Sequence, residues 1–328
     1  MALNSKLTLY WLLRSLSAST VTSTGGRRRR LATRLSSVRS RTRIAPVRST
    51  SRPIPTNRSP AVPEPSGPCT VDGPTLQIRC LGRFEVRRDG VLISEWRRDK
   101  ARTLFKHLVD RRHPVHRDIL VELLWPESDS RAASNCLRVN LHALRQALGR
   151  ASGTADALVD YVKLDGTNVS LNHHAGLWID VEAFSENIEA GFRFERDHRM
   201  SEALRCYEAA EALYRDDYLV EDLYEDWTLV RREKLKDQYL MIVTRLADAS
   251  LERGDQMGCI IRCHRILEKD PCREDAYCRL MRCYAELGQV SQALHWYDLC
   301  VLTLRKELDI SPGEQTVRIR RMITAGRQ

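Results

Sequence analysis

Apolar and polar residues alternate with a period of two along residues 76–93, which predicts short strands with one buried face. Leu76, Ile78 and Cys80 form the first such run, and Phe84 and Val86 form the second. An Asp-Gly pair at positions 89–90, a strong signal for a tight hairpin turn, precedes a third apolar run at 91–93. We therefore predict a small antiparallel ribbon in this region.

Three segments with helical periodicity follow the ribbon. The first, about Arg98 to Arg111, repeats apolar residues at the spacing of a helix with one buried face. Those apolar residues are Ala101, Leu104, Phe105, Leu108 and Val109. The second covers about Arg117 to Leu124 and ends at a Trp-Pro pair. The third runs from about Asp129, a suitable N-cap, to Leu148 and stops at Gly149.

The third helix separates its side chains into two faces, because successive residues rotate by about 100°. The predicted buried stripe consists of four leucines: Leu137, Leu141, Leu144 and Leu148. A polar sector roughly 80° wide holds the candidate DNA-binding residues: Arg131, Asn135, Arg138, His142 and Arg145. No acidic residue lies between Ser130 and Arg150. Arginine can bridge two acceptors of guanine and asparagine can do the same for adenine, so this pattern indicates a helix that reads the major groove. A solvated polar face is the simpler explanation of any single arginine.

Residues 161–171 form two short alternating runs on either side of Asp165-Gly166, which predicts a β-hairpin. A group of three helices closed by a hairpin is a winged helix. In such a fold, Lys163, Thr167 and Asn168 are placed to reach the sugar-phosphate backbone or the minor groove. A hairpin with a purely structural role is the alternative.

Residues 179–325 are helical by pattern, with predicted breaks at Gly191, Gly254 and Gly288. A shift of 34 residues superimposes Gly254 on Gly288, Arg245-Leu246 on Arg279-Leu280, and Cys263 on Tyr297. This is the period of tetratricopeptide units, whose stacked helix pairs form a curved surface that commonly receives a partner segment. We expect Ala203, Gly254, Gly288 and Ala293 to hold the stack together.

Charge divides the chain into three parts. Of the formal net charge of +10, residues 1–63 contribute 13 Lys/Arg without any Asp or Glu, and residues 76–172 contribute a net +5. Residues 173–328 carry 23 basic and 29 acidic residues. An anionic partner such as DNA is therefore expected for the first two parts and not for the third.

Residues 1–75 are rich in Ser, Arg and Pro, and we expect them to be a disordered basic tail. Three interpretations remain open for this tail: an organellar transit peptide, an arm that attracts phosphates without sequence preference, or a misassigned start codon. Leu7 to Leu16 is too short to span a membrane and makes a poor signal peptide. No transmembrane segment is expected further along the chain.

The ten cysteines are scattered over helical segments, so we interpret them as small, reduced core residues. Cys259, Cys263 and His264 suggest a metal site, but no C-x-x-C pair supports one and the two cysteines have core spacing. The sequence also lacks the phosphate-binding loop, the nucleophile elbow and the H-E-x-x-H motif. We expect no catalytic activity, no cofactor and no metal.

A family resemblance rests on several of these segments. The run from Leu76 through Leu171, with Leu123-Leu124-Trp125-Pro126, resembles the winged helix of Streptomyces antibiotic regulatory proteins, which is of the response-regulator type. Residues 178–184, 214–227 and 308–312 resemble the bacterial transcriptional activator domain that accompanies it. The long basic tail and His142 depart from that pattern.

The resemblance implies a sequence-specific activator in the bacterial cytoplasm, associated with the nucleoid. Its partners would be double-stranded promoter DNA and RNA polymerase, with a homodimer on repeated half-sites as a further expectation. The expected architecture is mainly α with a small β component. The tail at 1–75 precedes a winged helix-turn-helix at 76–172 and a tetratricopeptide-like activator domain at 176–328.

Two other functions compete with this one. The main rival is a tetratricopeptide scaffold whose winged helix does not bind DNA. A weaker rival, suggested by the start of the chain, is an imported organellar or RNA-binding protein. Sequence-blind, salt-sensitive DNA binding would favour the scaffold.

Overall fold

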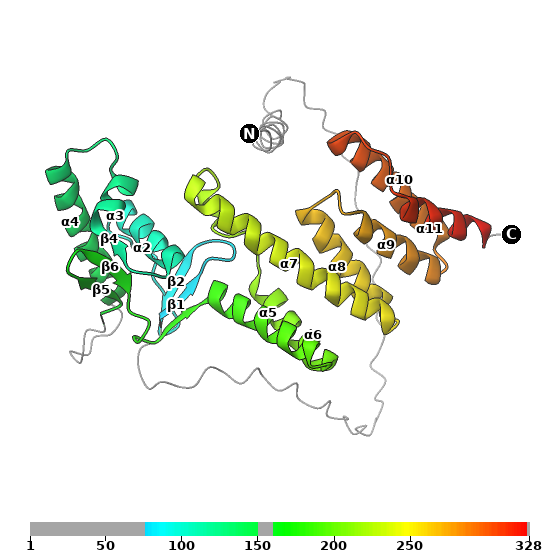
Figure 1. The fold of residues 1–328 in the computed structure, drawn as a ribbon, viewed down its shortest axis with the longest axis horizontal. Coiled ribbons are helices and arrows are strands. Elements are labelled where there is room, and N and C mark those ends of the chain that lie inside the picture. Colours follow the sequence, from blue (N-terminus) through cyan, green and yellow to red (C-terminus); the bar gives the residue numbers. More distant parts are fainter. Residues whose placement is uncertain (1–75, 150–159, 327–328) are drawn as a thin grey trace, which may run out of the picture. The chain divides into compact units, whose positions relative to one another are not determined.

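The computed structural model describes residues 76–149 and 160–326, all of which belong to one compact unit, Gly67–Gln328. The other unit, Met1–Ser66, lies outside the described residues, as do the expectations made for the basic tail. The described part is mainly helical with a small β component, which confirms the predicted fold class (Figure 1).

The predicted ribbon at the start of this part is present. Strands β1 (Leu76–Arg79) and β2 (Glu85–Arg88) pair antiparallel, and β2 also pairs antiparallel with β3 (Val91–Leu92). Asp89 and Gly90 in the turn both have positive φ angles, of 50° and 79°, as a two-residue hairpin of this kind requires. The alternating apolar residues of β1 and β2 face inward and are buried, which is the physical reason for their spacing.

The three predicted helices are α2 (Asp99–Arg111), α3 (Arg117–Leu124) and α4 (Ser130–Gly149). Asp129 caps α4 as predicted: its carboxylate accepts a hydrogen bond from the backbone N–H of Arg131 at 3.2 Å. The five apolar residues of the α2 stripe are all buried in the core.

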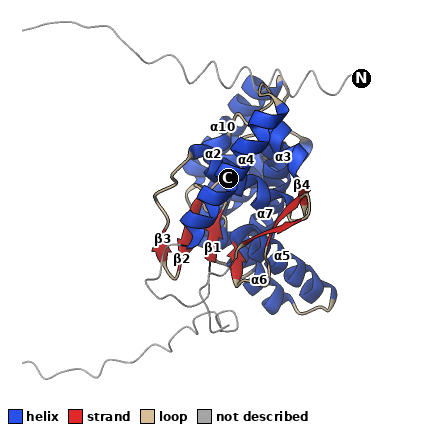
Figure 2. Cartoon of the chain, turned by 90° about the vertical axis from the view of Figure 1, so that its left-hand side faces the viewer, coloured by secondary structure: helices blue, strands red, loops and turns tan. Residues whose placement is uncertain are grey.

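The predicted hairpin is formed by β5 (Val162–Asp165) and β6 (Asn168–Leu171), with Gly166 at a positive φ of 56°. Its sheet has a third strand that the sequence pattern did not reveal, β4 (Val115–His116), and the strand order is β4-β6-β5. Figure 2 shows the strands in red among the helices. This group of helices and hairpin is the winged helix that was predicted.

The rest of the described chain is helical, apart from a short strand, β7 (Leu177–Ile179). None of the helices among residues 76–149 and 160–326 combines the length and apolar character needed to cross a bilayer. In chain order the helices are α5 (Asp180–Arg196), α6 (Met200–Leu213), the 3-10 turn η1 (Val220–Asp222), α7 (Asp226–Glu252), α8 (Gln256–Lys269), α9 (Glu274–Glu286), α10 (Val290–Leu308) and α11 (Glu314–Ala325).

The predicted repeat of 34 residues relates α7–α8 to α9–α10, which are consecutive helix hairpins. Gly254 and Gly288 occupy the turns of the two hairpins with φ angles of 71° and 73°. His198 takes the same left-handed position, at a φ of 56°, in the turn between α5 and α6. Ala203 and Ala293, three positions into the second helix of their hairpins, are completely buried, as expected for residues that hold the stack.

The predicted break at Gly191 is wrong. Gly191 lies inside α5, which continues to Arg196. A Cβ at this position would lie 2.3 Å from a ring carbon of Tyr207, so the glycine allows α5 and α6 to pack closely. Close helix approach, and not a turn, is the reason for this residue.

One buried carboxylate joins the first sheet to the repeat helices. Strand β7 pairs in parallel with β1, and Asp180 directly after β7 accepts hydrogen bonds from the backbone N–H groups of Cys80 and Leu81 at 2.8–2.9 Å. Burial raises the pKa of Asp180 above its ordinary value, while the backbone donors oppose the shift. The two predicted domains thus share one sheet; the boundary proposed at residues 172–176 stays a prediction.

Helix α2 also contacts the segment around the start of α7. Lys106 Nζ lies 2.5 Å from Asp222 Oδ2, although the lysine is almost fully buried. Arg231 donates to both the backbone carbonyl and the carboxylate of Asp110, and the Tyr218 hydroxyl donates to the same carboxylate at 2.9 Å. Buried charges are tolerated because each has an opposite partner.

His107 lies in this contact with its ring centroid 4.0 Å from that of Trp227, and burial lowers its pKa to about 4.

In the unfolded chain, His107 binds a proton near pH 6.5. The free energy of unfolding should therefore fall as the pH drops from about 6.5 towards 4. The loss should reach up to about 3 kcal/mol. His107→Phe should flatten the pH dependence of the free energy of unfolding in this window, whereas the exposed control His173→Phe should not. An unchanged slope in His107→Phe would contradict the assignment.

Candidate nucleic-acid interface

Helix α4 has the two opposite faces that its sequence predicts. The four leucines of the predicted stripe are buried, as are Ala133 and Asn140. The Asn140 amide donates to the carbonyl of Cys136 one turn earlier at 2.8 Å, within the helix. All five predicted residues of the polar sector are exposed: Arg131, Asn135, Arg138, His142 and Arg145.

The side chains of the first three of these residues are available for contacts with a partner. Among the described residues, no hydrogen bond or ion pair is formed by the side chains of Arg131, Asn135 and Arg138. They lie on the first three turns of α4, so the exposed face combines two guanidinium groups with one amide. These groups are suited to bidentate contacts with guanine and adenine edges.

His142 and Arg145 are engaged within the protein. The side-chain nitrogens His142 Nε2 and Gln146 Nε2 lie 2.8 Å apart, and Arg97 donates to Gln146 Oε1 at 2.6 Å. Because the Gln146 oxygen already accepts from Arg97, its amide nitrogen is the donor and the histidine nitrogen accepts. Arg145 donates to the carbonyl of Val162 at 2.8 Å, and its Nε lies 3.4 Å from Asp160. Arg145 therefore links α4 to the base of the hairpin.

The hairpin residues differ in their accessibility. Lys163 and Thr167 are exposed, whereas Asn168 is half-buried and pairs with His116 of β4. The backbone N–H of Arg117 donates to the carbonyl of Thr167 at 2.8 Å, so the tip of the hairpin is held against the start of α3. Lys163 and Thr167 are thus placed on a fixed scaffold.

Several structural residues had no clear signal in the sequence. Arg145 is separated from its partners Val162 and Asp160 by 15 or more positions in the sequence, so no local pattern predicts these contacts. The His142–Gln146 contact does have one, since the two residues are four apart on a helix. Asp180 could be recognised only from the resemblance of the segment around it.

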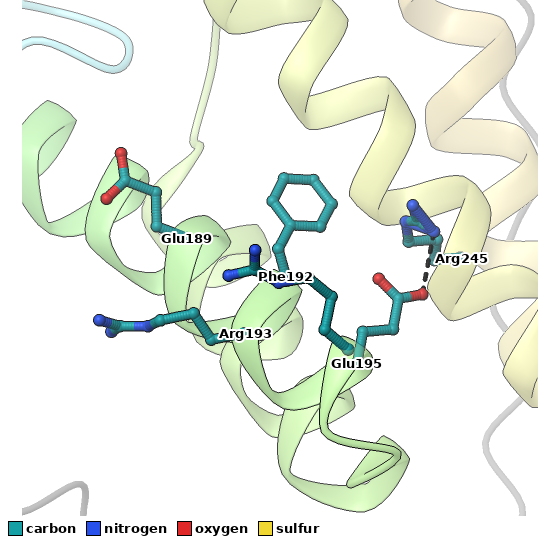
Figure 3. A pocket seen from close by; sticks show the side chains of 6 residues that line it. Glu189, Phe192, Arg193, Glu195 and Arg245 are labelled. Carbon is teal, nitrogen blue, oxygen red and sulfur yellow. Dashed lines mark hydrogen bonds and ion pairs between the residues drawn. The ribbon is translucent and has the colours of Figure 1, made fainter.

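The repeat helices carry a pocket of about 680 Å³ between α5 and α7. Glu195 accepts from Arg245 at 3.0 Å and from the Tyr207 hydroxyl at 2.7 Å, whereas Arg193 points away from that contact (Figure 3). The Glu195 contacts hold α5 and α6 to α7, and partner binding at this surface stays a prediction. The residues that line the pocket are Glu189, Phe192, Arg193, Glu195, Arg196 and Arg245.

Residues 179–324 match the family model of the bacterial transcriptional activator domain. The chain is similar to the transcriptional regulatory protein MoaR1 of Mycobacterium tuberculosis, with 23% identity over 246 residues that cover 73% of this chain and 76% of MoaR1. It is 25% identical over 250 residues to the transcriptional regulatory protein EmbR of the same organism, which covers 76% of this chain and 63% of EmbR. The chain thus spans less than two thirds of the length of EmbR.

Among solved structures, the chain is similar to Mycobacterium tuberculosis EmbR in complex with a low-affinity phosphopeptide. The TM-score is 0.61 at 23% identity, and the similarity covers 77% of this chain and 66% of that one. This likeness supports the shared fold. Together with the family match and the regulatory relatives, it confirms the resemblance predicted from the sequence.

The contacts of α4 predict different roles for two of its arginines. Arg145→Ala should lower the free energy of unfolding by about 1 kcal/mol, because the Val162 carbonyl loses a charged donor. Arg138→Ala, which removes no contact within the described residues, should change it by less than about 0.5 kcal/mol. Urea unfolding of the full chain measures both values. Equal effects would contradict the separation of a structural from an accessible arginine.

Proposed function

We propose that this chain, a transcriptional regulator of the Streptomyces antibiotic regulatory protein type, activates transcription by sequence-specific binding to promoter DNA. In this proposal, α4 lies in the major groove with its leucine face anchored in the protein. Arg131, Asn135 and Arg138 contact base edges. Lys163, Thr167 and Asn168 contact the sugar-phosphate backbone or the adjacent minor groove.

The observation that carries the proposal is the exposed side of α4. It presents two arginines and an asparagine whose side chains have no partner among the described residues, on a helix without acids. Polar side chains with free hydrogen-bonding groups on a rigid helix can be aligned with base edges at low entropic cost. His142 and Arg145 have mainly a positioning role in this proposal, since both already contact the protein.

Acidic groups border the site and limit how the DNA lies. Asp118 at the start of α3 is exposed beside Arg117, and Asp165 lies at the tip of the hairpin. Like charges repel, so phosphates should approach Lys163 and Arg117 and avoid these two carboxylates.

The activity also requires partners other than DNA. We assign RNA polymerase contact to the repeat helices, because the region after residue 173 is net acidic and unsuited to nucleic acid. A homodimer on repeated half-sites accounts for specificity over a longer sequence. The proposed setting is the bacterial nucleoid, with no catalytic step.

Substitution of the accessible face tests the proposal. Arg138→Ala and Asn135→Ala should each weaken binding to the specific site by roughly 1 to 3 kcal/mol and relax the preference at one base position. The matched control is Arg205→Ala, an exposed arginine of α6, which should leave binding unchanged. Gel-shift titrations of the full chain on its own upstream region measure the affinities.

Two results of the same titrations would contradict the proposal. Equal losses on every DNA sequence would reduce these residues to phosphate contacts. Wild-type binding that depends on salt but is blind to sequence would favour a protein-interaction scaffold with a winged helix that does not read DNA.

A further inference from the structure

A group of large apolar side chains is exposed where η1 leads into α7. Tyr224 is 88% exposed and Val230 is 80% exposed, and Leu223 and Leu229 are 41% and 39% exposed. All four lie within residues 223–230, and exposed aromatic and aliphatic residues gathered in one short segment are typical of protein-binding sites. We call Leu223, Tyr224, Leu229 and Val230, with the acids Glu225 and Asp226, the acidic-apolar patch.

The backbone beneath the acidic-apolar patch is firmly held. The buried guanidinium of Arg232 donates to the carbonyls of Tyr218, Leu219 and Asp222 at 2.8, 3.3 and 3.0 Å, and to the hydroxyl of Thr228 at 2.7 Å. An arginine that binds several carbonyls of one loop fixes the path of that loop. The patch is therefore a preorganised surface, which reduces the entropic cost of binding a partner.

The same segment is anchored to the winged helix. On its inner side, the ring of Trp227 packs at a tilt against that of His107 of α2, and Asp222 pairs with Lys106. A partner bound to the outer side would thus be held at a defined place relative to α2. This arrangement suits an activator that positions another protein beside its DNA site.

The charges of the patch select the kind of partner. Glu221 and Asp222 are compensated by Arg102 and Lys106. Glu225 and Asp226, which follow Tyr224 directly in the chain, are exposed, and their carboxylates form no ion pair among the described residues. Such a surface repels DNA phosphates and the same surface of a second copy, and it attracts a basic one.

We propose that the acidic-apolar patch docks a basic protein surface of RNA polymerase that offers an apolar pocket to Tyr224 and Val230. The inference rests on the proposed function, since it gives the polymerase contact a location. Tyr224 fills the pocket, and Glu225 and Asp226 pair with basic residues at its rim. Tyrosine is among the residues that dominate binding energy at protein interfaces.

The test uses the full chain in two assays, gel shift on the specific DNA site and run-off transcription with purified polymerase. Tyr224→Ser and the double variant Glu225→Lys/Asp226→Lys should each reduce activation about tenfold, the loss expected when a central interface residue is removed. Both should retain the wild-type affinity for DNA. Matched controls elsewhere on the repeat helices are Leu302→Ser, 64% exposed on α10, and Glu252→Lys at the end of α7.

The outcomes separate this inference from the proposed function. Failure of the wild-type chain to bind DNA specifically would overturn the proposed function itself. Normal DNA binding with normal activation in the patch variants would overturn the docking surface alone. A change in the mass of the free protein on Tyr224→Ser, measured by light scattering, would show that the patch joins two copies and would also overturn it.

A crosslinking experiment gives an independent readout. Replacement of Val230 by the photoreactive residue p-benzoylphenylalanine should yield an adduct with a polymerase subunit on the DNA site, at a peptide rich in Lys or Arg. The same residue at Leu302 should yield none. An adduct confined to a second copy of the chain, or to DNA, would contradict the proposal.

Discussion

Helix α4 must bury one side and leave the opposite side in water, because leucines recur on one face and polar residues on the other. Burial of a leucine side chain stabilises the fold by roughly 2 kcal/mol, so the four leucines resist any rotation of the helix about its axis. This constraint fixes the direction of Arg131, Asn135 and Arg138. The interface proposed for DNA thus follows from the packing of the core.

A second constraint joins this helical group to the repeats. Asp180 accepts hydrogen bonds from the chain just after β1, and α2 contacts the start of α7 through buried charges and the His107–Trp227 ring contact. Removing either member of a buried pair leaves the other without a partner, which is costly. The winged helix and the first repeats are therefore held together. The segment that contacts α2 also carries the acidic-apolar patch.

Local patterns predicted most of this fold. The helix bounds of α2, α3 and α4 agree with the apolar periodicity to within one residue, and both hairpins were recognised from their Asp-Gly pairs. The two-residue strand β4 is too short to have a period, and β7 pairs with a strand about 100 residues earlier. The break predicted at Gly191 is wrong because the sequence does not distinguish a glycine that permits close helix packing from one that ends a helix.

The sequence predicted which positions form the candidate site. It did not predict the contacts that their side chains make. Exposure of the polar sector follows from helical rotation, so it could be derived from sequence. The engagement of Arg145 with Val162, and of His142 with Gln146, depends on tertiary placement and on rotamers. Interactions across an interface, such as the pair of Lys106 and Asp222, likewise have no local signature.

The central claim, that the exposed side of α4 lies against base edges, is tested most directly by methylation interference on the specific DNA site. Methylation of guanine N7 blocks an acceptor in the major groove, and methylation of adenine N3 blocks one in the minor groove. The account predicts that N7 methylation at a few guanines abolishes binding of the full chain, and that Arg138→Ala removes the interference at one of them. Binding that is insensitive to N7 methylation throughout the site would contradict it.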